Sequence, residues 1–129
     1  MAFILIPKNG EDVTINAWNW RPTLELLRKN NLIDDDLWER MGTSCRRTIV
    51  YAGTVVRIAD FLDERLRTLK AGDRIRADLT VTNEAKKPLI FMPGMQTDQI
   101  DVVNAYSATY EWLVRFSDFA RVSGGFEIV

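Results

Sequence analysis

A thiol lies next to two guanidiniums in the first half of the chain, where Cys45 is followed by Arg46 and Arg47. Neighbouring positive charges favour the nucleophilic thiolate of an exposed cysteine, and they are equally suited to binding an anion. A cysteine nucleophile ordinarily needs a base, and the chain has no histidine to provide one. We therefore expect Arg46 and Arg47 to bind an anion or a partner, and we expect no catalytic role for Cys45.

The absence of histidine and the single cysteine exclude several classes of chemistry. They exclude metal sites built on imidazole or several thiolates, catalytic triads that need histidine, and any intramolecular disulfide. No glycine-rich phosphate loop occurs, because Gly124 and Gly125 follow a helical pattern instead of opening one. The 17 Lys and Arg against 18 Asp and Glu give a net charge of -1, which argues against binding nucleic acid by bulk charge. We expect no catalytic residue, no metal, no cofactor and no nucleic-acid partner.

The densest aromatic cluster contains Trp18, Trp20 and Arg21. Tryptophan and arginine are enriched in binding hot spots, because they bury large rigid surfaces and keep a polar group. On an extended strand Trp18 and Trp20 would share one face and Asn19 and Arg21 the other, and one of these two faces is a candidate ligand wall. The alternative is that members of the cluster fill the core where a hairpin meets a helix.

An acidic run, Asp34, Asp35 and Asp36, is the second candidate binding feature. Such a run can contact a basic partner or a hard cation, although its spacing does not match a calcium-binding loop. The alternative is a solvated helix start in which Asp34 caps free amides. The run would form one patch with the acids of the next helix, Asp60, Asp63 and Glu64, if the two helices were adjacent.

Tyr110 is the third candidate. It lies off the centre of an aromatic stripe that includes Trp112 and Phe116, and the stripe itself is typical of a helix face in the core. A half-exposed phenol at this position would serve a binding surface.

Hydrophobic periodicity predicts the elements that must position these residues. Asn9-Gly10 between two apolar runs predicts an opening hairpin, and Pro22 predicts the first position of a helix. Asp63 and Arg67 are expected to pair on one helix surface. The expected elements are strands 3–6, 13–17, 73–82 and 126–129, a possible strand 89–92, and helices 22–29, 34–42, 54–70 and 98–122.

These elements predict an α+β fold: a mainly antiparallel sheet with two longer helices, about 54–70 and 98–122, packed on one face. Hydrophobic residues make up 47% and charged residues 27% of the 129 residues, as in a soluble globular domain, so we expect residues 1–129 to form one domain. The first residues lack a basic leader and no run approaches the roughly 20 apolar residues of a membrane span. A lone cysteine suits a reducing compartment, and we expect a cytoplasmic protein with no membrane association.

Two segments carry a resemblance. Trp18 to Leu27 and Tyr106 to Phe126 resemble segments of small uncharacterised bacterial proteins, some of which have the size and style of toxin-immunity proteins. The resemblance implies a single-domain bacterial cytosolic protein, and it implies no catalytic residue.

The sequence therefore favours a non-catalytic protein-binding module, such as an immunity or regulatory protein that neutralises a partner. The alternative is a small-molecule binder or unfamiliar enzyme, with a pocket lined by Trp18, Tyr106 and Tyr110 and an anion anchor at Arg46 or Arg47. A third hypothesis is a homodimer formed through a sheet edge, either at 126–129 or at the opening hairpin.

Overall fold

The computed structural model describes residues 2–43, 47–84 and 106–129. The predicted fold class is confirmed: the chain is α+β, and its strands pair antiparallel. The strands form two sheets where we expected one, in the orders β2-β1-β7-β3 and β5-β4-β6. The predicted strand 89–92 lies outside the described residues.

The opening hairpin is confirmed. Strand β1 (Ala2–Pro7) pairs antiparallel with β2 (Val13–Asn16), with Leu5 opposite Val13. Gly10 takes a φ of 99° in the connecting loop, a conformation that glycine adopts without a Cβ clash. Alternate residues of both strands are buried, so one face of the hairpin lines the core.

The last strand, β7 (Phe126–Ile128), is confirmed, but it is not a sheet edge. It pairs with β1 on one side and with β3 (Thr48–Val50) on the other. Both of its hydrogen-bonding sides are therefore occupied, and the expectation of an open edge at 126–129 is wrong. The edge strands of this sheet are β2 and β3.

The predicted strand 73–82 is two strands, β4 (Arg74–Arg76) and β5 (Val81–Thr82), joined by a tight turn. The Asp78 carboxylate accepts from the Thr80 amide at 3.1 Å, and Leu79 takes a φ of 70°. Arg74, which the alternation placed on the polar face, is buried in the structure. Its guanidinium donates to the Ser107 hydroxyl at 2.9 Å.

The first helix begins earlier than predicted. Helix α1 (Ala17–Lys29) starts after Asn16, whose side chain accepts from the Asn19 amide at 3.0 Å, and Pro22 lies inside the helix. Helix α2 (Asp35–Met41) follows as expected, because Asp34 caps it and Gly42 ends it. Trp18 and Trp20 are thus on a helix and not on a strand, so they do not share a face.

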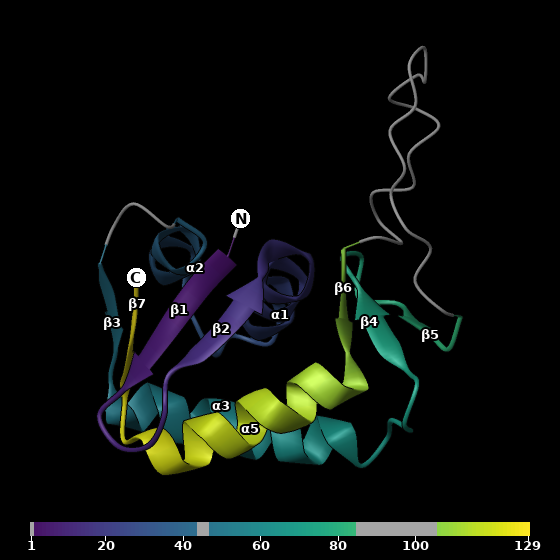
Figure 1. Cartoon of the computed structure of the whole chain (residues 1–129). Helices are drawn as coiled ribbons and strands as arrows, with labels where there is room; N and C mark the ends of the chain where they lie inside the picture. The colour runs from purple at the N-terminus through teal and green to yellow at the C-terminus, as the bar shows by residue number, and fades with distance from the viewer. Residues whose placement is uncertain (1, 44–46, 85–105) are drawn as a thin grey trace.

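The two longer predicted helices differ in extent from those in the structure, and residues 98–105 of the second lie outside the described residues. Helix α3 (Ala52–Leu66) ends before Gly72, and within the described residues the last helix is α5 (Tyr110–Ser123). Residues Ser107–Thr109 form β6, and the Thr109 hydroxyl caps α5 by accepting from the Trp112 amide at 3.2 Å. Figure 1 shows α3 and α5 running antiparallel and side by side at one end of the four-stranded sheet, and they pack against each other.

The core lies where this helix pair, α1 and the inner face of the four-stranded sheet meet. Its centre is a set of packed rings: Trp20 meets Phe116 edge to face at 5.4 Å between centroids, and Phe116 stacks on Trp112 at 5.4 Å. Aromatic pairs at these separations add stabilisation beyond the area that they bury. The aromatic stripe of α5 therefore belongs to the core, as its helical spacing predicted.

Candidate functional site

An open cavity of about 360 Å³ lies between α1, α2 and the three-stranded sheet. Helix α1 contributes three side chains, which recur at helical spacing and therefore share one face. Helix α2 and the residues that follow it provide the opposite wall, and Ala77 and Tyr106, which flank β4 and β6, also line the cavity. The lining residues are Arg21, Leu24, Glu25, Trp38, Glu39, Gly42, Thr43, Ala77 and Tyr106. We refer to this cavity as the α1–α2 groove.

The floor of the groove is apolar and fixed. Leu24 is buried in the core, and Trp38 is half-buried against it. Gly42 ends α2 at the base of the groove, where a methyl group added to its Cα would lie 3.6 Å from a methyl of Leu24. The absence of a side chain at Gly42 therefore leaves room in the groove.

Arg28 holds α2 against α1. Its guanidinium is ion-paired with Glu25, lies 3.6 Å from the Asp35 carboxylate, and stands 4.3 Å above the centre of the Trp38 ring. The combination of cation-π contact and ion pairs fixes one face of the Trp38 indole. Trp38 can therefore act as a preformed wall of the groove.

The tryptophans of the aromatic cluster have separate roles. Trp20 is fully buried, and its indole N–H donates to the Met41 carbonyl at 3.0 Å, which ties α1 to the end of α2. Trp18 is 37% exposed. The centroid of its ring lies 4.3 Å from that of Tyr106, which lines the groove. Of this cluster only Arg21 lines the groove itself.

The acidic run is largely engaged within the fold. Asp34 caps α2, Asp35 faces Arg28, and Asp36 pairs with Arg40 at 3.0 Å. These pairs lie on the surface, where each contributes little to stability. The three carboxylates lie on the start of α2, while the groove opens along its later residues.

Two rim charges of the groove have no ion-pair partner in the part of the chain that the structure describes. Arg21 projects from α1 and Glu39 from α2, and both are exposed. A guanidinium and a carboxylate on opposite walls can each contact a charge of opposite sign on a bound molecule.

The other candidates lie elsewhere. Arg47 is ion-paired with Glu127 on the four-stranded sheet, with a guanidinium nitrogen 3.0 Å from a carboxylate oxygen. Tyr110 is half-buried at the start of α5 and does not line the groove. Cys45 and Arg46 lie outside the described residues. Of the three residues expected to line a pocket, Trp18, Tyr106 and Tyr110, only Tyr106 lines the groove.

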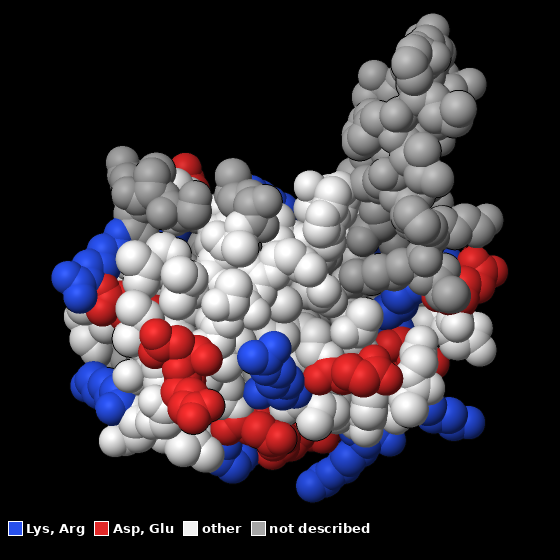
Figure 2. All heavy atoms as spheres, viewed as in Figure 1, with Lys and Arg blue, Asp and Glu red and all other residues white. Residues whose placement is uncertain are grey.

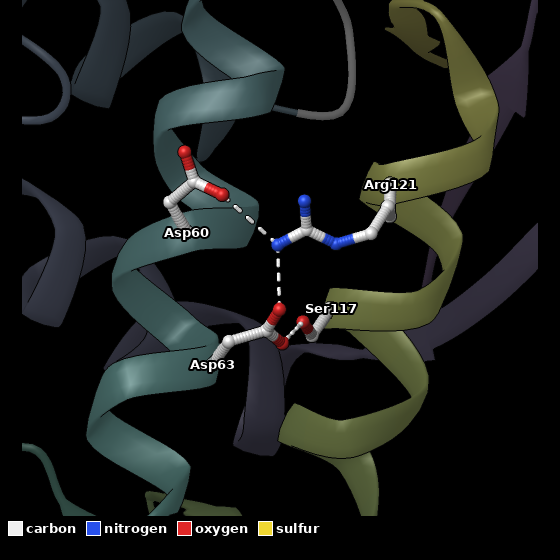
Figure 3. Close-up of polar contacts among 4 residues, drawn as sticks. All are labelled: Asp60, Asp63, Ser117 and Arg121. Carbon is white, nitrogen blue, oxygen red and sulfur yellow. Dashed lines mark hydrogen bonds and ion pairs between the residues drawn. The ribbon is translucent and has the colours of Figure 1, made fainter.

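The acids of α3 do not join those of α2, because two of them face α5. Figure 3 shows Arg121 of α5 between Asp60 and Asp63, with Ser117 on the other side of Asp63. The guanidinium lies 3.0 Å from the Asp60 carboxylate, and the buried Ser117 hydroxyl donates to Asp63. The expected partner of Asp63 within its own helix, Arg67, is thus replaced by Arg121 of a neighbouring helix. The cluster braces the two helices, and we assign it no catalytic role.

This cluster makes the stability of the fold depend on pH. The Ser117 hydroxyl and then the Arg121 guanidinium hold the pKa of the Asp63 carboxyl below its usual range. A carboxylate whose pKa is lower in the folded chain stabilises the fold above about pH 4, and this contribution is lost as the pH falls through the folded-state pKa. We expect Asp63→Asn to lower the urea midpoint of unfolding at pH 7 and to change it less below about pH 3.

Asp118→Asn is the control for this experiment. Asp118 is exposed on α5 and forms no ion pair with the residues described, so its midpoint should match the wild type at both pH values. An Asp63→Asn midpoint that differs from the wild type by the same amount at both pH values would contradict the assigned role of Asp63.

Comparison with known proteins adds no functional assignment. No protein-family model, no curated protein and no solved structure matches the chain. Within residues 2–43, 47–84 and 106–129, no three side chains among His, Cys, Asp and Glu form a group able to hold a metal. In the same residues no helix has the length and hydropathy of a membrane span.

Sequence reasoning missed most of the groove. The apolar residues Leu24 and Trp38 fit a core-facing helix pattern as well as a groove, and nothing in the local pattern indicates Glu25, Gly42 or Ala77. The one usable signal was the short connection between two amphipathic segments, which favours contact between α1 and α2.

Proposed function

We propose that this protein is a non-catalytic binding module that recognises another protein through the α1–α2 groove. The observation that carries the proposal is a fixed apolar floor beneath two rim charges that lack a described partner. An apolar pocket surrounded by polar groups is the usual form of an interface hot spot. Neutralising a partner by occupying its surface needs no reaction, so the proposal includes an immunity or regulatory role. The proposal also includes a cytoplasmic location.

The chemistry of the groove defines the segment that it would accept. The apolar lining of Leu24, Trp38 and Tyr106 suits one apolar or aromatic side chain. Arg21 favours an acidic neighbour on one side of that side chain, and Glu39 favours a basic neighbour on the other. The expected partner segment therefore has one apolar anchor between charges of opposite sign.

A small molecule is the second candidate occupant. The volume of about 360 Å³ falls near the lower end of the range of roughly 300 to 1,000 Å³ for small-molecule sites. The groove is open to solvent, however, and a small ligand would keep much of its surface in water. A protein anchor gains further contact around the rim, which favours the protein partner.

A substitution that fills the groove tests the proposal. Peptides from a random displayed library are selected on the wild-type protein and then measured against Gly42→Leu. A Cβ at Gly42 would make only ordinary contacts, at 3.5 Å and beyond, and its φ of -89° is open to leucine. We expect the fold to persist and the selected peptides to bind at least about tenfold more weakly, which is about 1.4 kcal/mol.

Gly53→Leu is the matched control, because a Cβ at Gly53 on α3 meets nothing within 4 Å. It should bind the selected peptides as the wild type does. Peptides that bind wild type and Gly42→Leu equally would place recognition elsewhere and would overturn the proposal, as would a library that yields no binding sequence.

A further inference from the structure

The four-stranded sheet has a second face, which none of the described helices covers (Figure 1). Its strands bury alternate residues such as Phe3, Leu5 and Ile128 on the inner side. The residues between them point to the outer side, as the alternation of a strand requires. Four of these outer residues are large and apolar, and each is between 37% and 48% exposed: Ile4, Ile6, Ile49 and Val129.

The register makes these four residues one patch. Ile6 and Ile49 lie on either side of Glu127 across the sheet. Ile4 and Val129 are hydrogen-bonded neighbours, with the Val129 amide donating to the Ile4 carbonyl at 3.0 Å. Figure 2 shows uncharged side chains over the upper part of β1 and β2, with acidic side chains nearer the hairpin loop. A contiguous apolar patch on a sheet is typical of an interaction surface.

Among the described residues of the four strands and Arg47, which precedes β3, the charged side chains on this face are Arg47 and Glu127. Arg47, directly before β3, is ion-paired with Glu127 of β7. Ile6 and Ile49 lie on either side of Glu127. A surface that carries one positive and one negative group matches itself when it is rotated by a two-fold axis. Each arginine would then face the glutamate of the other copy, so both charges keep an opposite charge after water is excluded.

We infer that the outer face of the four-stranded sheet associates with the same face of a second copy of the chain. Two twisted sheets pack face to face with their apolar side chains interleaved, about 10 Å apart. This pairing covers the apolar patch and places the two Arg47–Glu127 pairs against each other. It uses the opposite side of the sheet from the core and leaves the α1–α2 groove outside the contact.

Sedimentation equilibrium over a wide range of protein concentration tests the inference. The wild type is expected to rise toward twice the mass of one chain. Ile6→Lys combined with Ile49→Lys adds like charges to the patch and should keep the chain at the mass of one copy. Val56→Lys, at an exposed apolar residue of α3, should associate as the wild type does, and so should Gly42→Leu. Circular dichroism checks that each variant is folded.

A charge exchange tests the two-fold pairing directly. Arg47→Glu places two carboxylates at each contact and Glu127→Arg places two guanidiniums there, so each variant alone should remain at the mass of one chain. An equal mixture restores opposite charges across the interface and should associate. A wild type that keeps the mass of one chain at every concentration would overturn the inference. So would a double lysine variant that associates like the wild type, or a charge-exchange mixture that does not associate.

Discussion

Replacing Trp20 by alanine is expected to lower the free energy of unfolding by about 3–5 kcal/mol, the largest effect that we anticipate for any single substitution. The Trp20 side chain is completely buried, and its ring contacts Phe3, Trp112 and Phe116 with centroids 5.4 to 6.4 Å apart. Removing it leaves a cavity bordered by α1, α5 and β1, and rigid rings cannot easily collapse into that space.

Trp20→Phe separates the ring from its hydrogen bond. Phenylalanine keeps an aromatic ring but cannot donate to the Met41 carbonyl, which Trp20 reaches at 3.0 Å. Losing that donor inside the protein is expected to cost about 1–3 kcal/mol. The same change frees the end of α2 from α1, so peptide binding in the groove should also weaken.

Urea unfolding followed by far-ultraviolet circular dichroism measures the loss of stability of Trp20→Ala and of Trp20→Phe. Trp18→Ala is the control, because Trp18 is on the same helix but 37% exposed, and it should cost clearly less than Trp20→Ala. Equal losses for Trp18→Ala and Trp20→Ala would contradict the assignment of Trp20 to the core.

Gly125→Ala is expected to lower the free energy of unfolding by about 1–3 kcal/mol, the largest effect that we anticipate for a substitution outside Trp20. Gly125 connects α5 to β7 with a φ of 116°, which an L side chain rarely adopts. An added Cβ would lie 3.2 Å from the Val50 carbonyl oxygen, a backbone atom that is fixed by the pairing of β3 and β7. The Gly125 carbonyl also accepts from the Lys8 amide at 3.0 Å, so a shift of this residue disturbs β1 as well.

Two other glycines provide the comparison. At Gly124, which ends α5 with a φ of 67°, a Cβ would meet only the movable Asn9 side-chain amide, so Gly124→Ala should cost less than Gly125→Ala. Gly53→Ala on α3 should be neutral or stabilising, because open space surrounds its Cα and alanine favours a helix. Thermal unfolding ranks the three variants, and a Gly125→Ala protein as stable as Gly53→Ala would show that the described turn is wrong.

Features with a local cause could be predicted from the sequence. The Asn9-Gly10 turn, the Asp34 cap of α2 and the glycines after α5 each act through neighbouring residues. The spacing of hydrophobic residues was sufficient to predict the α+β class and the buried aromatic stripe of α5. Hydrophobic residues recur about every 2 positions in a strand and about every 3.6 in a helix, so the two patterns can be told apart.

Features that depend on contacts between distant residues could not be predicted. Alternation over 73–82 fits one strand or a hairpin equally well, and the turn at Asp78 decides between them. Asp63 has Arg67 one turn away, yet it bonds Arg121, which is 58 residues distant along the chain. The groove likewise depends on the contacts of Trp20 and Arg28 that join α1 to α2. Those contacts link residues far apart in the sequence, so no local pattern marks Gly42 or Ala77 as groove residues.

The central claim is that the α1–α2 groove is the recognition surface, and nuclear magnetic resonance tests it most directly. A selected peptide is titrated into protein labelled with nitrogen-15, and the signals of Trp38, Gly42 and Trp112 are followed. We predict that the Trp38 and Gly42 signals move progressively with added peptide. The indole signal of Trp112, which is buried and donates to Thr23 at 2.9 Å, should remain unchanged. Unchanged Trp38 and Gly42 signals with shifts confined to residues outside the groove would contradict the claim.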